Sequence, residues 1–290
     1  MRILLFGKNG QLGWELNRSL ITLGELTVLD YPEVDFNRPQ TLPEIVRATR
    51  PDVIVNAVAY TDVDRAESEP EIASRVNADA VAEIARTARS LGALLVHYST
   101  DYVFDGTKGS PYVETDPTHP LNVYGRTKLA GEEAAALAEK YLTLRTSWVY
   151  SSRGGFVGKV LEWAKTRSEL RVVDDQISGP TSARLLAEVT ALILARAGED
   201  PYRWFDERAG IYHCAGDGAC SRYEWAQKIL ELDPNKDKQK VQKLERAKSS
   251  EFPTPATRPM VSVLSNDKLE QVFGLRPPIW EVGLALTMGG

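Results

Sequence analysis

A glycine-rich turn between a short apolar run and an amphipathic helix constrains the fold of this chain more than any other feature. The run Arg2–Phe6 is apolar after its first residue, which is typical of a strand covered on both faces of a parallel sheet. Three glycines follow it at regular spacing: Gly7, Gly10 and Gly13. Leucines then recur every fourth residue from Leu12 to Leu20, which predicts an amphipathic helix. Such glycines allow a tight turn, close approach to a pyrophosphate and close packing of helix on strand. We therefore predict a dinucleotide site with its phosphates at the helix N-terminus, although a purely structural glycine turn is the alternative.

The second apolar run of the chain ends in an acidic residue, Asp30. A carboxylate at this place accepts hydrogen bonds from the adenine ribose and repels a 2′-phosphate, which favours NADH over NADPH. Arg18 or Arg38 could offset that repulsion, so both cofactors stay open. Asp35 and Phe36 follow in a loop that could border the adenine, and a surface loop explains them equally well.

Apolar runs and helical patterns alternate through the first half of the chain. Strands are expected at 53–58, 94–99 and 142–146, and helices at 70–91 and 123–140. This alternation predicts a Rossmann-type doubly wound α/β fold with a nearly parallel sheet. Ligands in such sheets lie beyond the carboxyl ends of the strands, so Ala59, Tyr60 and Thr61 should line the cofactor groove. Past residue 150 the alternation stops. We expect a nucleotide-binding domain over 1–150 and a smaller substrate domain over 151–290, with a strand near 211–215 returning to the sheet.

Tyr124 and Lys128 lie four residues apart on one predicted helix, so their side chains share a face. A nearby cation favours the phenolate and lowers a tyrosine pKa, which would make the pair a proton-transfer device. Thr100 and Asp101 end the preceding strand, and Thr100 could give a second hydrogen bond to the same substrate oxygen. Chance spacing on a surface helix is the alternative for the pair taken alone.

Composition excludes several classes of function. The net charge is −5 with dispersed basic residues, which argues against a nucleic-acid partner. No run reaches the about 18 apolar residues of a membrane helix, and no secretory signal is evident, so we expect a cytoplasmic protein. The two cysteines, Cys214 and Cys220, lack metal-ligand spacing, and no metal is expected. Within its strand pattern, His97 is interpreted as a core residue, and Asn77 is assigned a structural role.

With these motifs in hand, the chain resembles the extended short-chain dehydrogenase/reductase family over nearly its whole length. More narrowly, it is similar to the members that reduce a 4-keto sugar joined to dTDP. The stretches that carry the resemblance are Phe6–Gly13, Pro51–Asn56, Ser99–Phe104, Asn122–Glu132, Arg145–Tyr150 and the proline-rich segment ending at Pro259. The last two are far more specific than the family-wide motifs.

The resemblance implies reduction of dTDP-4-dehydro-β-L-rhamnose to dTDP-β-L-rhamnose by NADPH or NADH. It makes Tyr124 the general acid, Lys128 the residue that holds the nicotinamide ribose and tunes Tyr124, and Thr100 the group that polarises the carbonyl. Asp101 and Trp148 would shape the sugar site, with Trp148 as a flat apolar wall. The residues implied in cofactor binding are Gly7, Gly10, Gln11, Leu12, Gly13, Asp30, Asp35, Phe36, Ala59, Tyr60, Thr61, Tyr98, Tyr124 and Lys128.

Two other functions compete with this interpretation. A nucleotide-sugar epimerase or dehydratase of the same superfamily would keep its NAD tightly bound, and dehydratases commonly carry an acid pair where this chain has Asp101 followed by Tyr102. A non-catalytic subunit built on the same fold would usually lose the Tyr124/Lys128 pair. Some related reductases dimerise around magnesium held by glutamates, one of them near Glu15. Here Arg184 occupies the second such position, so we expect a monomer or a weak homodimer.

Overall fold

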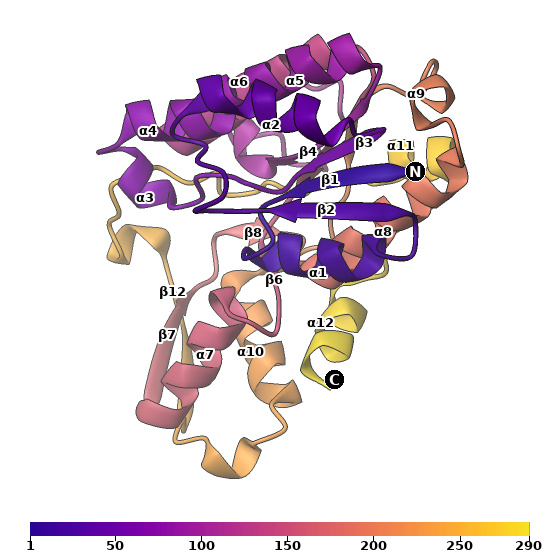
Figure 1. Cartoon of the computed structure of the whole chain (residues 1–290). Helices are drawn as coiled ribbons and strands as arrows, with labels where there is room; N and C mark the ends of the chain where they lie inside the picture. The colour runs from indigo at the N-terminus through magenta and orange to yellow at the C-terminus, as the bar shows by residue number, and fades with distance from the viewer. Residues whose placement is uncertain (290) are drawn as a thin grey trace.

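The computed structural model of the chain describes residues 1–289 and is built around one six-stranded parallel sheet (Figure 1). The strand order is β10-β5-β4-β3-β1-β2. The strands of this sheet are β1 (Arg2–Phe6), β2 (Glu25–Leu29), β3 (Val53–Asn56), β4 (Leu94–Thr100), β5 (Tyr141–Thr146) and β10 (Gly210–His213). The order reverses beside β1, and a crevice for a ligand forms at such a reversal in doubly wound sheets. The predicted fold class is confirmed.

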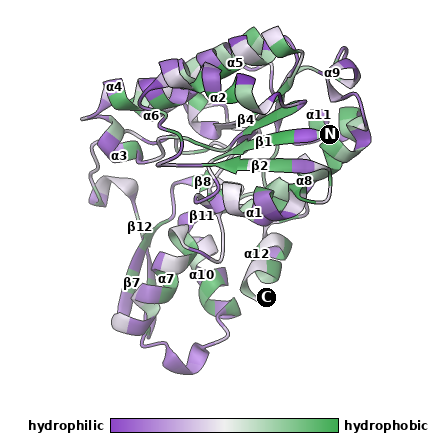
Figure 2. Cartoon of the chain, viewed as in Figure 1, coloured by the Kyte–Doolittle hydropathy of each residue, from purple (hydrophilic) through white to green (hydrophobic). Residues whose placement is uncertain are grey.

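Helices cover both faces of the sheet, whose strands are mainly hydrophobic (Figure 2). The side chains that alternate along the strands are buried in two clusters, one on each face. One face packs against α1 (Gln11–Leu20), α8 (Ala183–Ala197) and α11 (Asp267–Phe273). The other packs against α2 (Leu42–Thr49), α5 (Ala80–Leu91) and α6 (Val123–Ala135). Since both faces are covered, the central strands β1 and β3 consist almost wholly of apolar residues. The C-terminal half of the chain therefore contributes strand β10 to the sheet and helices α8 and α11 to one of the two layers that cover it.

The helix expected over 70–91 is interrupted. It consists of α4 (Pro70–Ser74), a π-helical turn (Arg75–Asp79) and α5. Helix α6 ends at Ala135 rather than near Lys140, because a 3₁₀ turn (Ala136–Ala138) and the positive φ of Glu139, 62°, close it. The remaining helices are α3 (Val63–Ala66), α7 (Gly155–Thr166), α9 (Pro201–Trp204), α10 (Arg222–Leu232) and α12 (Trp280–Met288), with 3₁₀ turns at Pro39–Thr41, Asp101–Val103, Lys236–Lys238 and Ser249–Glu251.

A smaller lobe lies below the carboxyl edge of the sheet in Figure 1 and contains α7, α10 and three short strand pairs. The pairs are β6 (Val149–Tyr150) with β9 (Thr181–Ser182), β7 (Glu169–Val173) with β12 (Lys243–Ala247), and β8 (Ile177–Ser178) with β11 (Cys220–Ser221). The charged stretch 236–248 belongs to this lobe. Its second half is β12, whose alternate charged side chains, such as those of Lys243 and Glu245, form an ion pair at the surface.

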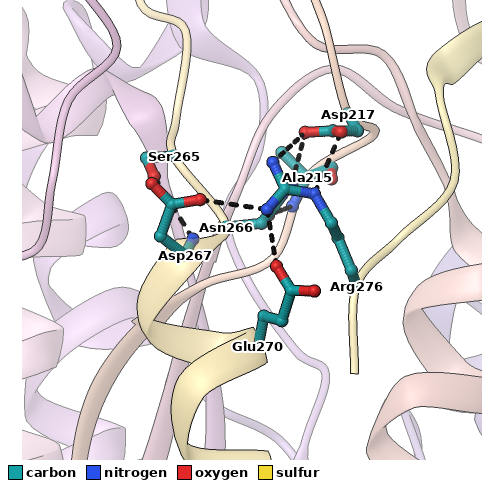
Figure 3. Close-up of polar contacts among 7 residues, drawn as sticks. All are labelled: Ala215, Asp217, Ser265, Asn266, Asp267, Glu270 and Arg276. Carbon is teal, nitrogen blue, oxygen red and sulfur yellow. Dashed lines mark hydrogen bonds and ion pairs between the residues drawn. The ribbon is translucent and has the colours of Figure 1, made fainter. Parts of the chain in front are cut away.

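Arg276 holds the C-terminal segment against the loop that follows β10 (Figure 3). Its guanidinium forms ion pairs with Asp217 at 3.1 Å, Asp267 at 3.0 Å and Glu270 at 2.7 Å. Two backbone hydrogen bonds strengthen the same connection. The N–H of Asp217 donates to the Pro278 carbonyl oxygen, and the N–H of Trp280 donates to the Asp217 carbonyl oxygen. No helix among residues 1–289 is long and apolar enough to cross a membrane.

Candidate active site

The glycine loop forms an open cradle between β1 and α1. Gly7 has a φ of +96°, and a Cβ placed on Gly13 would lie 1.8 Å from the Gly7 carbonyl oxygen, so neither position accepts a side chain. A Cβ on Gly10 would meet no atom closer than 3.5 Å. Gly10 is the N-cap of α1 and supplies no capping side chain, so backbone N–H groups of the first turn are left for a ligand. These donors at a helix N-terminus fit the pyrophosphate of a dinucleotide, and Gln11 and Leu12 lie on that first turn.

Asp30 lies against the glycine loop, where an adenine ribose would be bound. Its carboxylate accepts hydrogen bonds from the backbone N–H of Asn9 at 2.8 Å and of Tyr31 at 2.7 Å. Both arginines that could have offset its charge are engaged elsewhere. The Arg18 guanidinium lies 4.7 Å from the centre of the Trp14 ring, and Arg38 forms an ion pair with Asp35 at 3.6 Å.

Phe36 and Tyr98, which the resemblance implies in cofactor binding, both have buried side chains. Phe36 is buried in the core, where its ring packs edge-to-face on Phe6 with centroids 5.5 Å apart. The Tyr98 side chain lies in the core on the α8 side, and its hydroxyl is 2.8 Å from Thr190 Oγ1. Only the backbone carbonyl of Tyr98 faces the candidate site.

The segment after β3 is held in place by Asn77 from the π-helical turn. The Asn77 amide accepts from Tyr60 N at 2.8 Å and donates to Tyr60 O at 3.2 Å and to Thr127 at 3.0 Å. These bonds position Ala59, Tyr60 and Thr61 at the end of β3, while the Tyr60 hydroxyl donates to Glu69 at 2.8 Å. The structural role predicted for Asn77 is confirmed.

Lys128 is buried and anchored to the neighbouring strand. Its Nζ donates to the carbonyl oxygen of Tyr98 at 2.6 Å. Burial lowers the pKa of Lys128 to about 8, and the charge of Glu132 one turn later acts in the opposite direction. Glu132 is itself fixed by a buried ion pair with Arg145, at 2.7 and 2.8 Å, and by the Ser99 hydroxyl at 2.5 Å.

Tyr124 lies one helical turn before Lys128, with its ring edge-to-face on Tyr102 at 5.7 Å. We expected Lys128 to lower its pKa, and in the structure burial raises that pKa instead, while the neighbouring Thr100 hydroxyl acts in the opposite direction. The Lys128 ammonium donates to the carbonyl oxygen of Tyr98 and not to the phenol. The phenol is therefore protonated at neutral pH and suited to donate a proton.

Thr100 and Asp101 form one hydrogen-bonded unit at the end of β4. The Thr100 hydroxyl donates to Asp101 Oδ1 at 3.1 Å, and Tyr102 N donates to Thr100 Oγ1 at 3.2 Å. Asp101 Oδ2 accepts from Ser262 Oγ at 2.5 Å and from Ser178 Oγ at 3.4 Å. Burial raises the pKa of Asp101 to about 6. Both serines come from distant parts of the chain, and no sequence motif marks them.

Trp148 has a strained backbone, with a φ of +43°, and its ring packs against the core of the smaller lobe. Trp225 of α10 stacks on it at 5.5 Å with an interplanar angle of 14°. The Arg222 guanidinium lies 3.6 Å from the centre of the Trp148 ring and 5.5 Å from that of Trp225. If Arg222 and Trp225 lay on opposite faces of the Trp148 ring, the guanidinium would be more than 5.5 Å from the centre of Trp225. Because it is 5.5 Å from that centre, Arg222 and Trp225 lie on the same face of Trp148. Sequence reasoning missed Arg222, which stands in no motif.

His97, and the residues at the position where some related reductases hold magnesium, lie as follows. His97 is fully buried in β4 with Nδ1 3.4 Å from the Asn56 amide, as a core residue should be. Within residues 1–289, no three His, Cys, Asp or Glu side chains come together in a way that could hold a metal ion. Glu15 and Arg184 line one groove between α1 and α8, of about 440 Å³, and Arg184 pairs with Glu188 at 2.9 Å.

Comparison with known proteins agrees with this geometry. The family model described as RmlD substrate binding domain matches residues 1–289. The dTDP-4-dehydrorhamnose reductase of Escherichia coli K12 is 46% identical over 98% of this chain and 96% of its own length. The crystal structure of a dTDP-4-dehydrorhamnose reductase from Clostridium acetobutylicum has a TM-score of 0.91 at 35% identity, covering 100% of this chain and 99% of that one. That of the Bacillus anthracis reductase in complex with NADP has a TM-score of 0.89 at 33% identity, covering 99% and 98%.

Proposed function

The chain belongs to the RmlD substrate binding domain family, and we infer that it reduces the C4 keto group of dTDP-4-dehydro-β-L-rhamnose to give dTDP-β-L-rhamnose. It is an NAD(P)H-dependent oxidoreductase of the last step of dTDP-L-rhamnose synthesis. One observation carries this conclusion for the chain's own residues. The buried Lys128 and Thr100 and the partly buried Tyr124 lie at the carboxyl edge of the sheet, on the same edge as the glycine loop.

We propose that Tyr124 protonates the C4 oxygen while the nicotinamide supplies a hydride to C4. Burial keeps the phenol protonated, and a positioned proton donor typically contributes about 10²–10⁴-fold in rate. Lys128, fixed to the Tyr98 carbonyl, has further N–H groups for the nicotinamide ribose. The Thr100 hydroxyl is next to the Tyr124 phenol. It would donate to the same keto oxygen when its hydrogen turns away from Asp101.

The sugar-binding roles of Asp101 and Trp148 are part of the same proposal. Asp101 is held by Thr100, Ser178 and Ser262, so its carboxylate has a fixed orientation beside the proton donor. Trp148 has Arg222 and Trp225 on one face, which leaves its other face for the apolar side of a deoxy sugar. Flat aromatic surfaces bind such faces with little loss of side-chain entropy.

Turnover with the keto sugar tests the function directly. We expect the purified protein to oxidise NADPH, and NADH in a parallel assay, in proportion to added dTDP-4-dehydro-L-rhamnose, measured as loss of the reduced nicotinamide absorbance. Folded protein that oxidises neither cofactor would contradict the proposal. Cofactor that stays bound through purification, with epimerised rather than reduced sugar as product, would support the epimerase alternative instead.

We also propose that the protein acts as a monomer or weak homodimer, without nucleic acid as a partner. The Arg184 guanidinium, which pairs with Glu188, lines the same groove as Glu15. Its positive charge disfavours the binding of a divalent metal ion in that groove. Sedimentation velocity with and without EDTA tests this, and a magnesium-dependent dimer would contradict it. The cytoplasmic location expected from the sequence stays a prediction.

A further inference from the structure

Arg222, the first residue of α10, is surrounded by aromatic rings beside the candidate sugar site. Its guanidinium carbon lies 3.6 Å from the centre of the Trp148 ring, 5.2 Å from that of Phe156 and 5.5 Å from that of Trp225. A guanidinium flat on an indole is held in one plane, so its N–H groups point outward along that plane. The three rings therefore orient the donors of Arg222 before any ligand arrives.

The guanidinium of Arg222 has no acid or carbonyl partner among residues 1–289. The backbone N–H of Arg222 donates to Gln176 O at 3.2 Å, so the backbone is held while the guanidinium is not hydrogen-bonded to these groups. Asp101 is close enough to interact with it electrostatically, but that carboxylate accepts from Thr100 and Ser262. An arginine carries five N–H donors, and a cation taken out of water without a counter-ion is costly. An anionic group of a bound ligand would therefore supply the counter-ion that Arg222 lacks.

A second cation faces the same region and makes the need for an anion greater. Arg258, from the proline-rich segment, lies near enough for its charge to act on Arg222, and both act on Tyr102. Arg258 has its own partner, Asp64, at 2.6 Å, whereas Arg222 has none. Asp64 balances the charge of Arg258 but not that of Arg222, and an anionic ligand beside Arg222 would balance the remaining positive charge.

We propose that Arg222 binds the diphosphate of the sugar nucleotide, with its guanidinium braced on Trp148. The inference rests on the proposed function, because it takes the substrate to be a sugar joined to a nucleoside diphosphate. In such a molecule the diphosphate is attached directly to the sugar, so a sugar on the open face of Trp148 places phosphate oxygens at the edge of the indole ring. The N–H groups of Arg222, which lies on the opposite face of that ring, point outward to the same edge. Planar N–H pairs match phosphate oxygens in a bidentate manner.

Binding of dTDP alone tests this independently of turnover. Replacing Arg222 by Met keeps the apolar contact with Trp148 and removes the donors. We expect Arg222→Met to weaken dTDP binding about 10- to 100-fold in calorimetry, to raise the KM for the keto sugar similarly, and to leave thymidine and NADPH affinities unchanged. Arg222→Lys should recover part of the loss, because it restores charge but not the planar fork.

Arg246→Met is the matched control. The Arg246 guanidinium also lies over an aromatic ring of the same lobe, 4.3 Å from the centre of Tyr223, but it pairs with Asp174 at 3.7 Å. This variant should bind dTDP as the unmodified protein does. Normal dTDP affinity in a folded Arg222→Met protein would overturn the inference. If the unmodified protein binds dTDP through Arg222 but does not reduce the keto sugar, the proposed function fails and the diphosphate site stands.

Discussion

The Nζ of Lys128 donates a hydrogen bond to the carbonyl oxygen of Tyr98 across 2.6 Å, joining α6 to β4 inside the protein. This bond fixes the ammonium at the carboxyl edge of the sheet, one helical turn from Tyr124. It leaves two N–H donors of Lys128 for a ligand. The lysine is therefore a positioned donor, and its charge state decides what it can bind.

We predict that kcat/KM for NADPH falls as the pH rises through about 8. Burial lowers the pKa of Lys128 to about 8, so the ammonium loses its proton there and binds the ribose hydroxyls less well. Lys128→Met should lower kcat/KM at neutral pH by about 10²-fold and remove this step from the profile. Lys268→Met is a matched control, since Lys268 also donates to a backbone carbonyl, that of Ile211 at 2.7 Å, and burial also lowers its pKa. A profile that keeps its step in Lys128→Met would contradict the assignment.

Tyr124→Phe should lower kcat by at least about 10²-fold while NADPH affinity is kept. The substitution removes only the hydroxyl, and the ring can keep its edge-to-face contact with Tyr102. Stopped-flow turnover and a fluorescence titration with NADPH measure the two quantities separately. Tyr212→Phe controls for the loss of a buried hydroxyl, because that hydroxyl donates to Arg208 O at 2.8 Å, outside the site. Near-normal turnover in Tyr124→Phe would show that another group delivers the proton.

Asp30→Asn should shift cofactor preference toward NADPH, with the ratio of kcat/KM for NADPH to that for NADH rising about tenfold. The carboxylate repels a 2′-phosphate, and neither Arg18 nor Arg38 is paired with it. Asparagine removes the charge and keeps one oxygen to accept from the backbone N–H of Asn9 or Tyr31. Parallel kinetics with both cofactors test this. An unchanged ratio would mean that the 2′-position lies away from Asp30.

The parts of the fold that rest on local patterns could be predicted from the sequence. Most strands of the sheet are short, mainly apolar runs that alternate with helical patterns, and the glycine spacing indicates the turn after β1, so the doubly wound fold class follows from them. The π-helical turn at Arg75–Asp79 and strand β12 could not be predicted. The first depends on the close approach of α6, where a Cβ on Gly131 would lie 2.2 Å from Asn77 O. The second depends on pairing with β7, about seventy residues away in the chain.

The candidate site was only partly visible in the sequence for the same reason. Motifs identify Tyr124, Lys128 and Thr100, because their spacing along one helix or strand is local. Ser262 and Arg222 reach the site from segments far along the chain, and only the folded protein brings them to Asp101 and Trp148. The pKa of Tyr124 was misjudged because burial, which spacing does not show, outweighs the nearby lysine.

Asp101 should make the free energy of unfolding depend on pH. Burial raises its pKa from 3.8 to about 6 in the folded protein, so between about pH 4 and 6 the folded state binds more protons than the unfolded state. Stability therefore falls as the pH rises through this window. Asp101→Asn removes the ionisation. Relative to the unmodified protein, its free energy of unfolding should rise on the order of 2–3 kcal/mol from pH 4 to pH 7.

Urea unfolding of both proteins at intervals from pH 4 to pH 7 measures that difference, and the fixed cost of changing hydrogen bonds to Thr100 and Ser262 cancels in it. Ser262→Ala provides a second test. Its hydroxyl donates to Asp101 Oδ2 at 2.5 Å and holds the pKa of the carboxyl down, so its loss should move the window to higher pH. Parallel stability profiles for Asp101→Asn and the unmodified protein would show that Asp101 is ionised throughout, and that the carboxylate faces the substrate with its full charge.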